Sequence, residues 1–375
     1  MIYLDNAATT KPSANAINEA NIFNAKAYFN PSALYQGGID NNKELKSSRQ
    51  AILSCLGISN NNFEVIFTSC GSESDNLATF CVKKRGVFVT SKGEHSAIYK
   101  SFLELKQRNL SVEFIDLNPD GSVNTEKLFD YVKNNKVDFV SIVHVNNETG
   151  AINDINYIAN TLKAINPSII FHSDGVQAFG KLDFTLSKSV DLYSVSAHKI
   201  NGLKGVGALI KRKNLNISPL IFGGGQEGGI RSGTENIFGI KVFEYVSLDH
   251  YKNIQSNFEY VLSLKDYFIN NIDKDIFTII SSPNSSPYIL SISAKGLKGE
   301  VIMHSLEQFD IIVGNGSACS SKSPYSRILS ACGFKKDILE GVIRISFSPE
   351  NTMEEIIYSV KQLNFVANKL KGIMN

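Results

Sequence analysis

The chain reads Ser-Val-Ser-Ala-His-Lys-Ile-Asn-Gly at residues 194–202, and this stretch decides the fold. The apolar residues Val190, Leu192 and Val195 predict a buried strand that ends in a polar loop. Lys199 lies in that loop. A lysine at a strand end can form a Schiff base, because a desolvated amine loses its proton and attacks a carbonyl group. The alternative is a solvated surface lysine, and the rest of the chain must decide between the two.

Working outward, apolar segments alternate with helical patterns through the first half of the chain. This alternation predicts βα units, an α/β fold and a mostly parallel sheet, with loops at the strand C-termini available for a ligand. The segment at 206–211 follows its predecessor too closely for a crossover helix, so we expect it to pair antiparallel. The expected parallel strands are residues 65–68, 87–90, 112–117, 139–145, 169–172 and 192–196.

The pattern changes after a glycine-dense segment at residues 223–233. We expect one long helix over residues 244–271 and, beyond it, a small α+β domain. The prediction is therefore an N-terminal segment that packs with the small domain, a large domain, and the small C-terminal domain. Their predicted boundaries are 1–15, 16–255 and 256–375.

Composition narrows the class of protein. Hydrophobic residues make up 43% of the chain and charged residues 20%, which is typical of a soluble globular protein. The net charge of +2 gives no support for a direct nucleic-acid partner. We expect no membrane association, because neither a signal-peptide pattern nor an apolar run of about 18 residues is found. The five cysteines form no Cys-x-x-Cys pair, which argues against disulfides and a metal site and for the reducing cytoplasm: Cys55, Cys70, Cys81, Cys319 and Cys332.

Two more predicted strands are followed by candidate site residues. Asp174 comes directly after the strand at 169–172, about one βα unit before Lys199. An acid there is commonly a turn or cap residue, yet it is also the partner that a protonated pyridine ring needs. His95 follows the strand at 87–90, and from the same sheet edge it could stack on a flat cofactor or relay a proton. A lone histidine, however, is usually structural.

The segment at residues 68–76 joins a strand to a helix. Its simplest interpretation is a helix cap, with Ser72 capping and Asp75 three positions later. A second interpretation is a phosphate site, because free N–H groups and the positive end of a helix attract an anion. Both can hold at once. The glycine spacing at 223–228 matches a dinucleotide-binding pattern, but another glycine-rich stretch follows instead of a helix, so we discard that match.

A loop of small residues near the C-terminus contains one cysteine. Residues 314–322 read GNGSACSSK, with Cys319 three positions before Lys322. Most cysteines are buried and inert. The glycines and serines around this one instead predict an exposed and reactive thiol.

These residues together resemble the pyridoxal-phosphate (PLP)-dependent cysteine desulfurases of the NifS/IscS type, which are related to class V aminotransferases. The resemblance runs nearly from end to end and implies PLP fold-type I, a PLP-binding large domain and a homodimer. It rests on short motifs in the same order, which are residues 3–10 (YLDNAATT), 30–32 (NPS), 73–76 (ESDN), 94–95 (EH), 144–150 (HVNNETG), 196–199 (SAHK), 223–227 (GGGQE), 231–234 (RSGT), 316–319 (GSAC) and Arg344.

The resemblance implies a role for each matched residue. Lys199 would hold PLP and move the substrate Cα proton, while Asp174 would pair with the pyridinium nitrogen and His95 would stack on the ring. Cys319 would attack the sulfur of L-cysteine, which leaves a persulfide on the enzyme and releases L-alanine. The remaining roles are Gln177 for the ring hydroxyl with Asn147 beside it, Arg344 for the substrate carboxylate, and Gly71, Ser72, Ser196, His198 and the partner subunit's Thr234 for the phosphate.

Some features depart from the family pattern or stay open. Gly71 and Ser72 stand where many members have Ala-Thr, and Gly175 follows Asp174 where alanine is common. The resemblance implies a sulfur-acceptor protein, either an iron–sulfur scaffold or a tRNA-thiolation enzyme, without deciding which. Two alternatives remain: a selenocysteine lyase or other PLP lyase on the same fold, and a non-catalytic partner or sulfur carrier.

Overall fold

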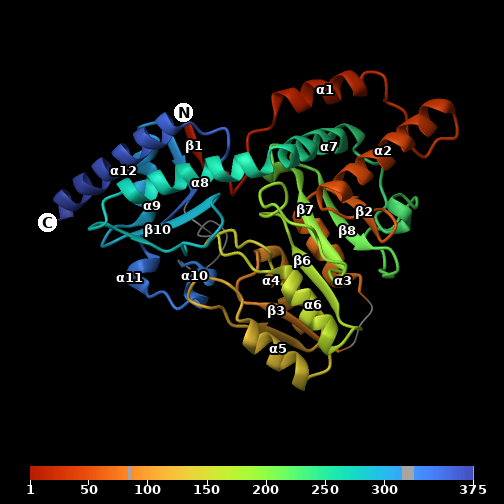
Figure 1. The fold of residues 1–375 in the computed structure, drawn as a ribbon, viewed down its shortest axis with the longest axis horizontal. Coiled ribbons are helices and arrows are strands. Elements are labelled where there is room, and N and C mark those ends of the chain that lie inside the picture. Colours follow the sequence, from red (N-terminus) through yellow and green to blue (C-terminus); the bar gives the residue numbers. More distant parts are fainter. Residues whose placement is uncertain (83–85, 315–324, 375) are drawn as a thin grey trace.

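A mixed sheet of seven strands forms the larger region of the molecule (Figure 1). The computed structural model describes residues 1–82, 86–314 and 325–374. In strand order the sheet is β2-β8-β7-β6-β5-β3-β4, and only β8 runs antiparallel to its neighbours. This confirms the expected α/β fold and the antiparallel pairing after β7. The strands are β2 (Phe63–Thr68), β3 (Val87–Ser91), β4 (Val112–Ile115), β5 (Val137–Ser141), β6 (Ile170–Asp174), β7 (Leu192–Ser196) and β8 (Gly207–Arg212).

Helices cover both faces of this sheet, which explains why its strands are apolar on both sides. On one face, α3 and α4 pack with Phe88 and Phe139 in one hydrophobic cluster. On the other, α2, α5, α6 and α7 pack with Val89 and Val140 in a larger cluster. The helices are α1 (Ala14–Asn24), α2 (Gln36–Cys55), α3 (Gly71–Phe80), α4 (Ser96–Gln107), α5 (Thr125–Asn134), α6 (Ile155–Ile165) and α7 (Ile237–Lys252).

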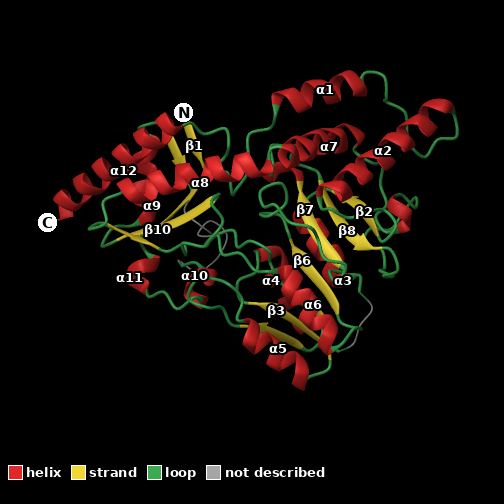
Figure 2. Ribbon diagram, viewed as in Figure 1, coloured by secondary structure: helices red, strands yellow, loops and turns green. Residues whose placement is uncertain are grey.

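A smaller region holds the C-terminal part of the chain (Figure 2). Its antiparallel sheet has the order β12-β10-β9, and beside it β1 pairs parallel with β11. Leu4 of β1 is fully buried in the core of this region. The elements are β1 (Ile2–Leu4), α8 (Ile254–Asn271), β9 (Phe277–Ile279), β10 (Ile289–Ala294), α9 (Gly299–Glu307), β11 (Ile311–Val313), α10 (Arg327–Ala331), α11 (Lys336–Leu339), β12 (Val342–Ser346) and α12 (Met353–Met374).

The expected single helix over 244–271 is wrong, because α7 and α8 meet there end to end. Asn253 lies between them with φ −110° and ψ 14°, outside the helical range. Its side-chain nitrogen donates to Asp249 O at 3.0 Å, and an asparagine that bonds nearby backbone in this way competes with the helical bonds. This break lies two residues before the predicted domain boundary at 255/256, and we keep that boundary as a proposal.

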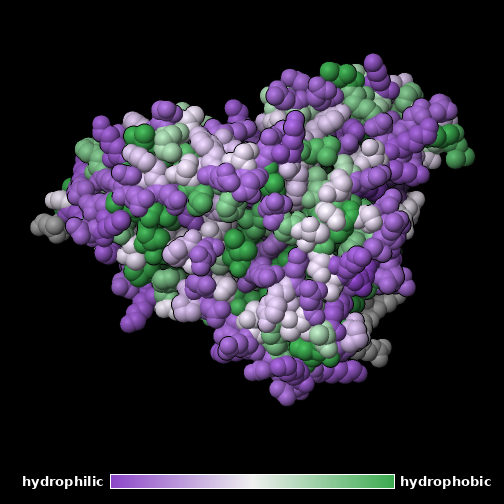
Figure 3. Space-filling view, in the orientation of Figure 1, coloured by the Kyte–Doolittle hydropathy of each residue, from purple (hydrophilic) through white to green (hydrophobic). Residues whose placement is uncertain are grey.

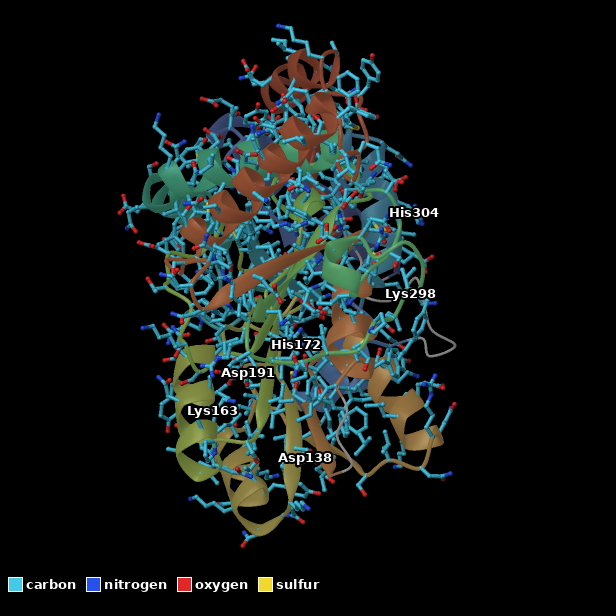
Figure 4. All side chains as sticks on the ribbon, turned by 90° about the vertical axis from the view of Figure 1, so that its right-hand side faces the viewer. Asp138, Lys163, His172, Asp191, Lys298 and His304 are labelled. Atoms are coloured by element: carbon cyan, nitrogen blue, oxygen red, sulfur yellow. The ribbon has the colours of Figure 1, made fainter. Side chains whose placement is uncertain are left out.

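The parallel strands of the large sheet end at one edge, so the loops that follow them meet there. At the other end of the sheet, Lys163 of α6 donates to the Asp191 carboxylate at 2.5 Å (Figure 4). This ion pair connects α6 to the residue directly before β7. His172 lies between these two ends, fully buried within β6. Among the described residues, none of the helices has the length and apolar character that crossing a membrane requires.

Candidate active site

A cavity of about 310 Å³ lies where the strand-end loops meet the N-terminal segment and β12. Its wall brings together nearly all of the residues predicted from the sequence, although they are spread over more than 270 positions. Thr234 is exposed and does not line it. Cys319 lies outside the described residues. The predicted residues in the wall are Gly71, Ser72, His95, Asn147, Asp174, Gln177, Ser196, His198, Lys199 and Arg344.

Lys199 lies in a short 3₁₀ turn, residues Ala197–Lys199, directly after β7. Its Nζ donates to the backbone oxygens of Ala7 at 2.6 Å and Ala8 at 2.7 Å. Burial lowers the pKa of Lys199 to about 8; the Arg344 charge adds to this, while Asp174 opposes it. A larger fraction of this amine is therefore neutral near neutral pH than of an exposed lysine, as nucleophilic attack requires.

Asp174 is the last residue of β6, and its side chain lines the cavity. Its Oδ1 accepts a hydrogen bond from Val176 N at 2.9 Å, and the side chain is buried. Burial raises the pKa of this carboxyl, and the nearby His95 and Lys199 oppose the shift. A cationic ring nitrogen bound next to Asp174 would further stabilise the ionised carboxylate, because opposite charges attract strongly in a buried site.

Asp75 of α3 is a site residue that the sequence interpretation missed. We expected a helix cap at Ser72, but α3 begins at Gly71, with Cys70 as an N-cap that makes no side-chain cap bond. Asp75 therefore lies on the second turn, fully buried, and burial with the Asp174 charge raises its pKa well above the usual value. Ligand atoms of Asp75, His95 and Asp174 lie within 4.8 Å of one another, and within the described ranges this is the one cluster spaced to hold a metal ion.

His95 caps α4 and presents its ring to the cavity. Its Nδ1 accepts a hydrogen bond from Ala97 N at 3.2 Å, so in the neutral ring the proton is on Nε2. His95 is exposed to the cavity, yet partial desolvation by the surrounding protein lowers the pKa of its ring; the Asp174 charge opposes the shift, and Lys199 and Arg327 reinforce it. The ring is thus mostly neutral at pH 7, which suits both stacking and proton transfer.

Arg344 reaches the cavity from β12 and closes its opposite wall. One guanidinium nitrogen donates to Asn147 O at 2.9 Å and another to the Asp5 carboxylate at 2.8 Å. Within the described part of the chain, Arg344 Nε and Asn147 Oδ1 have no hydrogen-bond partner although both atoms are buried. This wall therefore has spare polar groups for a ligand.

The start of α3 forms a third wall. A Cβ added at Gly71 would lie 2.7 Å from Val176 Cγ2, so a larger residue here would require the Val176 side chain to shift. Ser196 Oγ is buried and has no partner among the described residues, while His198 Nδ1 lies 3.1 Å from Thr9 Oγ1. Burial, with Lys199 and Lys181 nearby, lowers the pKa of His198 to about 4. The unpartnered hydroxyl of Ser196 and the backbone N–H groups at the start of α3 suit an anion.

Cys70 and Lys181 are further residues that the sequence interpretation did not single out. Cys70 is half-buried and lines the cavity beside Gly71. Lys181 is buried behind Gln177. Neither could be found from spacing, since a cysteine or lysine within a βα loop has many possible orientations.

Comparison with known proteins gives one consistent family. The aminotransferase class-V family model matches residues 2–358. Cysteine desulfurase IscS of Dictyoglomus turgidum is 33% identical over 99% of this chain and 96% of its own length. The solved structure of a NifS-like protein superposes with a TM-score of 0.91 at 31% identity, covering 98% of this chain and 99% of that one. A structure described as SspA in complex with cysteine gives 0.80 at 26% identity, covering 94% and 100%.

Proposed function

Because the chain belongs to the aminotransferase class-V family and, within it, to the cysteine desulfurase family, we propose that it removes the sulfur atom of L-cysteine and releases L-alanine. The cofactor of this family is PLP. The observation that supports the proposal most directly is the cavity itself, in which the amine of Lys199 and the carboxylate of Asp174 face the same space. Either residue alone would fit many proteins.

The residues present fit PLP. Asp174 offers a buried carboxylate to the ring nitrogen, and Lys199 offers an amine that loses its proton easily. The unpartnered Ser196 Oγ and the close backbone approach at Gly71 suit the phosphate. Bound at this position, PLP supplies an electron sink for bonds that break next to the substrate nitrogen.

Each residue then has a defined task. Lys199 holds the cofactor and moves the proton at the substrate Cα. Asp174 keeps a proton on the ring nitrogen, and His95 covers the ring and exchanges protons through Nε2. Arg344 binds the substrate carboxylate with its guanidinium group, whose planar geometry matches two carboxylate oxygens.

Cys319 is the proposed sulfur acceptor within the enzyme. Its thiolate attacks the sulfur of the bound cysteine, an S–S bond forms, and the C–S bond of the substrate breaks. The sulfur remains on Cys319 as a persulfide, and the carbon skeleton leaves as alanine after it takes up a proton. A loop of small residues, as the sequence has at 314–322, suits a thiol that must approach the substrate.

The proposal includes a homodimer in which the partner subunit's Thr234 completes the phosphate site. Green hydrophobic atoms lie at the outer end of the part of the molecule that holds α1 and α2 (Figure 3). In the chain between these two helices, Leu34 is 93% exposed and Tyr28 is 77% exposed. Phe222, shortly before the RSGT motif, is 82% exposed. Apolar surface of this kind is typical of an interface, and sedimentation should give about twice the mass of one 41.3 kDa chain.

The route of the sulfur after Cys319 belongs to the proposal as well. A cytoplasmic acceptor protein receives it, either a scaffold for iron–sulfur clusters or an enzyme of tRNA thiolation. Capture of proteins that take labelled persulfide sulfur from the enzyme would distinguish these two. A selenocysteine lyase on the same fold remains the alternative activity.

The decisive experiment compares two cysteine variants of the PLP-loaded enzyme. Cys319→Ser should keep the visible absorbance of bound PLP but form almost no sulfide or alanine from cysteine, and mass spectrometry should find no added sulfur. Cys332→Ser is the matched control, because Cys332 is buried at the end of α10, and it should behave like the parent. A normal rate for Cys319→Ser, or a preference for selenocysteine in the parent enzyme, would overturn the proposal.

A further inference from the structure

Lys181 is a buried lysine that the proposed reaction does not use. Only 5% of its surface is exposed, and among the described residues there is no carboxylate within 4.0 Å of its Nζ. The one hydrogen bond that the structure gives it runs from Nζ to Gln177 Oε1, at 3.1 Å. Nζ also lies 5.7 Å from the ring centre of Tyr288. A buried amine with so few partners is costly, so its place beside the cavity needs an explanation.

Lys181 connects to the cavity through Gln177. Gln177 lines the cavity and donates from Nε2 to the backbone oxygen of Ala7 at 2.9 Å. The same oxygen accepts the hydrogen bond from Lys199 Nζ at 2.6 Å. Two lysines thus lie at the ends of one chain of contacts, with the Gln177 amide and the Ala7 carbonyl between them.

The donor at one end of this chain fixes the orientation of the amide. A protonated lysine has three donors and no acceptor, so the Gln177 atom that faces Lys181 must be the oxygen. The Gln177 NH2 group then has to point away from Lys181, toward Ala7 and the cavity. The bond from Nε2 to the Ala7 oxygen favours the same orientation, because a carbonyl oxygen can only accept. Lys181 is the partner that bonds to Oε1 in the described contacts, so the two bonds hold the amide from both sides.

We propose that Lys181 is a positioning residue that holds the Gln177 NH2 group toward the ring oxygen of the bound cofactor. This inference rests on the proposed function, since it needs PLP in the cavity. Burial, with the charges of Lys199 and Arg344, lowers the pKa of Lys181 to about 7, and an anionic ring oxygen nearby would favour its protonated form.

A second buried lysine shows what a purely structural role looks like. Lys265 of α8 is also only 3% exposed, and burial lowers its pKa to about 8. Its Nζ donates to Ser285 Oγ at 2.7 Å and to Ser286 O at 3.0 Å, so it ties two parts of the smaller region together. Lys181 instead bonds a side chain of the cavity wall, and Lys265 is its matched control.

The test is the Lys181→Met change in the PLP-loaded enzyme, which removes the donor and keeps the length of the side chain. We expect the dissociation constant of PLP, measured by equilibrium dialysis, to rise about 5- to 10-fold, as for the loss of one hydrogen bond. The visible absorption band of bound PLP should shift. Gln177→Met should do the same, and in that background Lys181→Met should add less than about twofold, because the two act as a unit.

Lys265→Met should lower the melting temperature but leave the PLP band and dissociation constant unchanged. If Lys181→Met behaves in the same way, its role is structural and the inference is wrong. A full additional loss of PLP affinity in the Gln177→Met background would also overturn it. If Lys181→Met does not fold, Lys181→Gln keeps a donor and should retain the parent band. Dialysis measures PLP alone, so failure of the desulfurase proposal would appear separately, as absence of sulfide production.

Discussion

The two ends of the cavity carry buried groups of opposite charge. At the acidic end, Asp174 and Asp75 lie on the large sheet and its covering helix, and their pKa values are raised because burial disfavours the ionised form. At the basic end, burial lowers the pKa of Lys199 and Lys181 for the same reason. Within the described part of the chain, no ion pair joins either of these aspartates to either of these lysines. Burial thus disfavours the charged form at both ends, and a ligand with a cationic ring nitrogen and anionic groups would supply the opposite charges that stabilise these forms.

The two ends also differ in how the chain assembles them. Two strands of one sheet position the acidic end, because Asp75 lies on α3 directly after β2 and Asp174 ends β6. The basic end takes Arg344 from β12, the carbonyl groups of Ala7 and Ala8 from the N-terminal segment, and Lys199 from the turn after β7. The basic end therefore depends on how the smaller region docks against the sheet.

Removing the amine at the basic end should have the largest effect. Lys199→Ala should abolish turnover, a loss of at least about 10³-fold, because both the link to the cofactor and the proton carrier disappear. After borohydride reduction of the parent enzyme, peptide mass mapping should find the pyridoxyl group on Lys199. Lys204 is the exposed control, and finding the label there would contradict the assignment.

At the acidic end, the two aspartates should respond differently to the same change. Asp174→Asn should still bind PLP but lower kcat by about 10²- to 10⁴-fold, since an amide does not hold the ring proton. Asp75→Asn should change kcat by less than about fivefold, because burial and the Asp174 charge favour the neutral carboxyl, and an amide keeps its size and polarity. Equal losses in steady-state assays of the two variants would mean that Asp75 is ionised in the working enzyme.

A pH titration compares the same ends without mutation. The folded pKa of Lys199 is about 8, below the 10.5 of an exposed lysine. Capture of PLP by the cofactor-free protein should therefore accelerate about tenfold per pH unit below 8 and level off above it, as stopped-flow absorbance can follow. Between pH 8 and 10.5 the folded protein binds fewer protons at this group than the unfolded chain, so its contribution to stability rises with pH. A rate independent of pH would contradict the lowered pKa.

Arg344 tests whether the basic end recognises the substrate carboxylate. Arg344→Lys keeps the charge but loses the planar pair of donors, so we expect the KM for cysteine to rise about 10-fold with a smaller change in kcat. Steady-state kinetics measure both. A variant that lowers kcat and leaves KM unchanged would assign Arg344 to the chemistry instead of to binding.

The smallest expected effect on turnover comes from a change in packing next to Asp174, where the main effect should be on stability. A Cβ added at Gly175 would lie 1.9 Å from Cζ of Tyr193, whose hydroxyl lies 2.9 Å from His144 Nδ1. Gly175→Ala should therefore lower the free energy of unfolding by about 1–3 kcal/mol, measured with urea. Combining it with Tyr193→Leu should restore part of the loss. If Gly175→Ala alone is neutral, the ring moves aside more easily than the packing indicates.

The part of the site that the sequence could predict is the part that lies directly after parallel strands. Residues placed directly after parallel strands, such as Asp174, His95 and Lys199, could be assigned to one site because those strands end at a common edge. Asp75 could not, because whether it faces the sheet depends on where α3 starts, and the sequence pointed to a cap at Ser72 instead. The sequence likewise gave no sign that Gly175 leaves room for Tyr193, since that contact joins neighbouring strands.

The smaller region was predictable as α+β but not in its connections. The resemblance led us to expect residues 1–15 against the small domain, but nothing local indicates that β1 pairs with β11, or that Asp5 binds Arg344 across 339 positions. Such contacts depend on tertiary packing, which leaves no periodic signal. The sequence analysis missed Lys181 for a similar reason, because its hydrogen bond to the Gln177 side chain leaves no pattern in the sequence.

The pairing of β1 with β11 has a consequence for synthesis on the ribosome. At about 5–20 residues per second, the 339 positions between Asp5 and Arg344 take on the order of 20–70 s to translate. During that interval the first residues of the chain are already made, while the strand and the arginine that will hold them do not yet exist. The wall of Ala7 and Ala8 around Lys199 is thus translated long before the strands that order it, and a nascent chain cannot retain cofactor through this wall until β12 has been made.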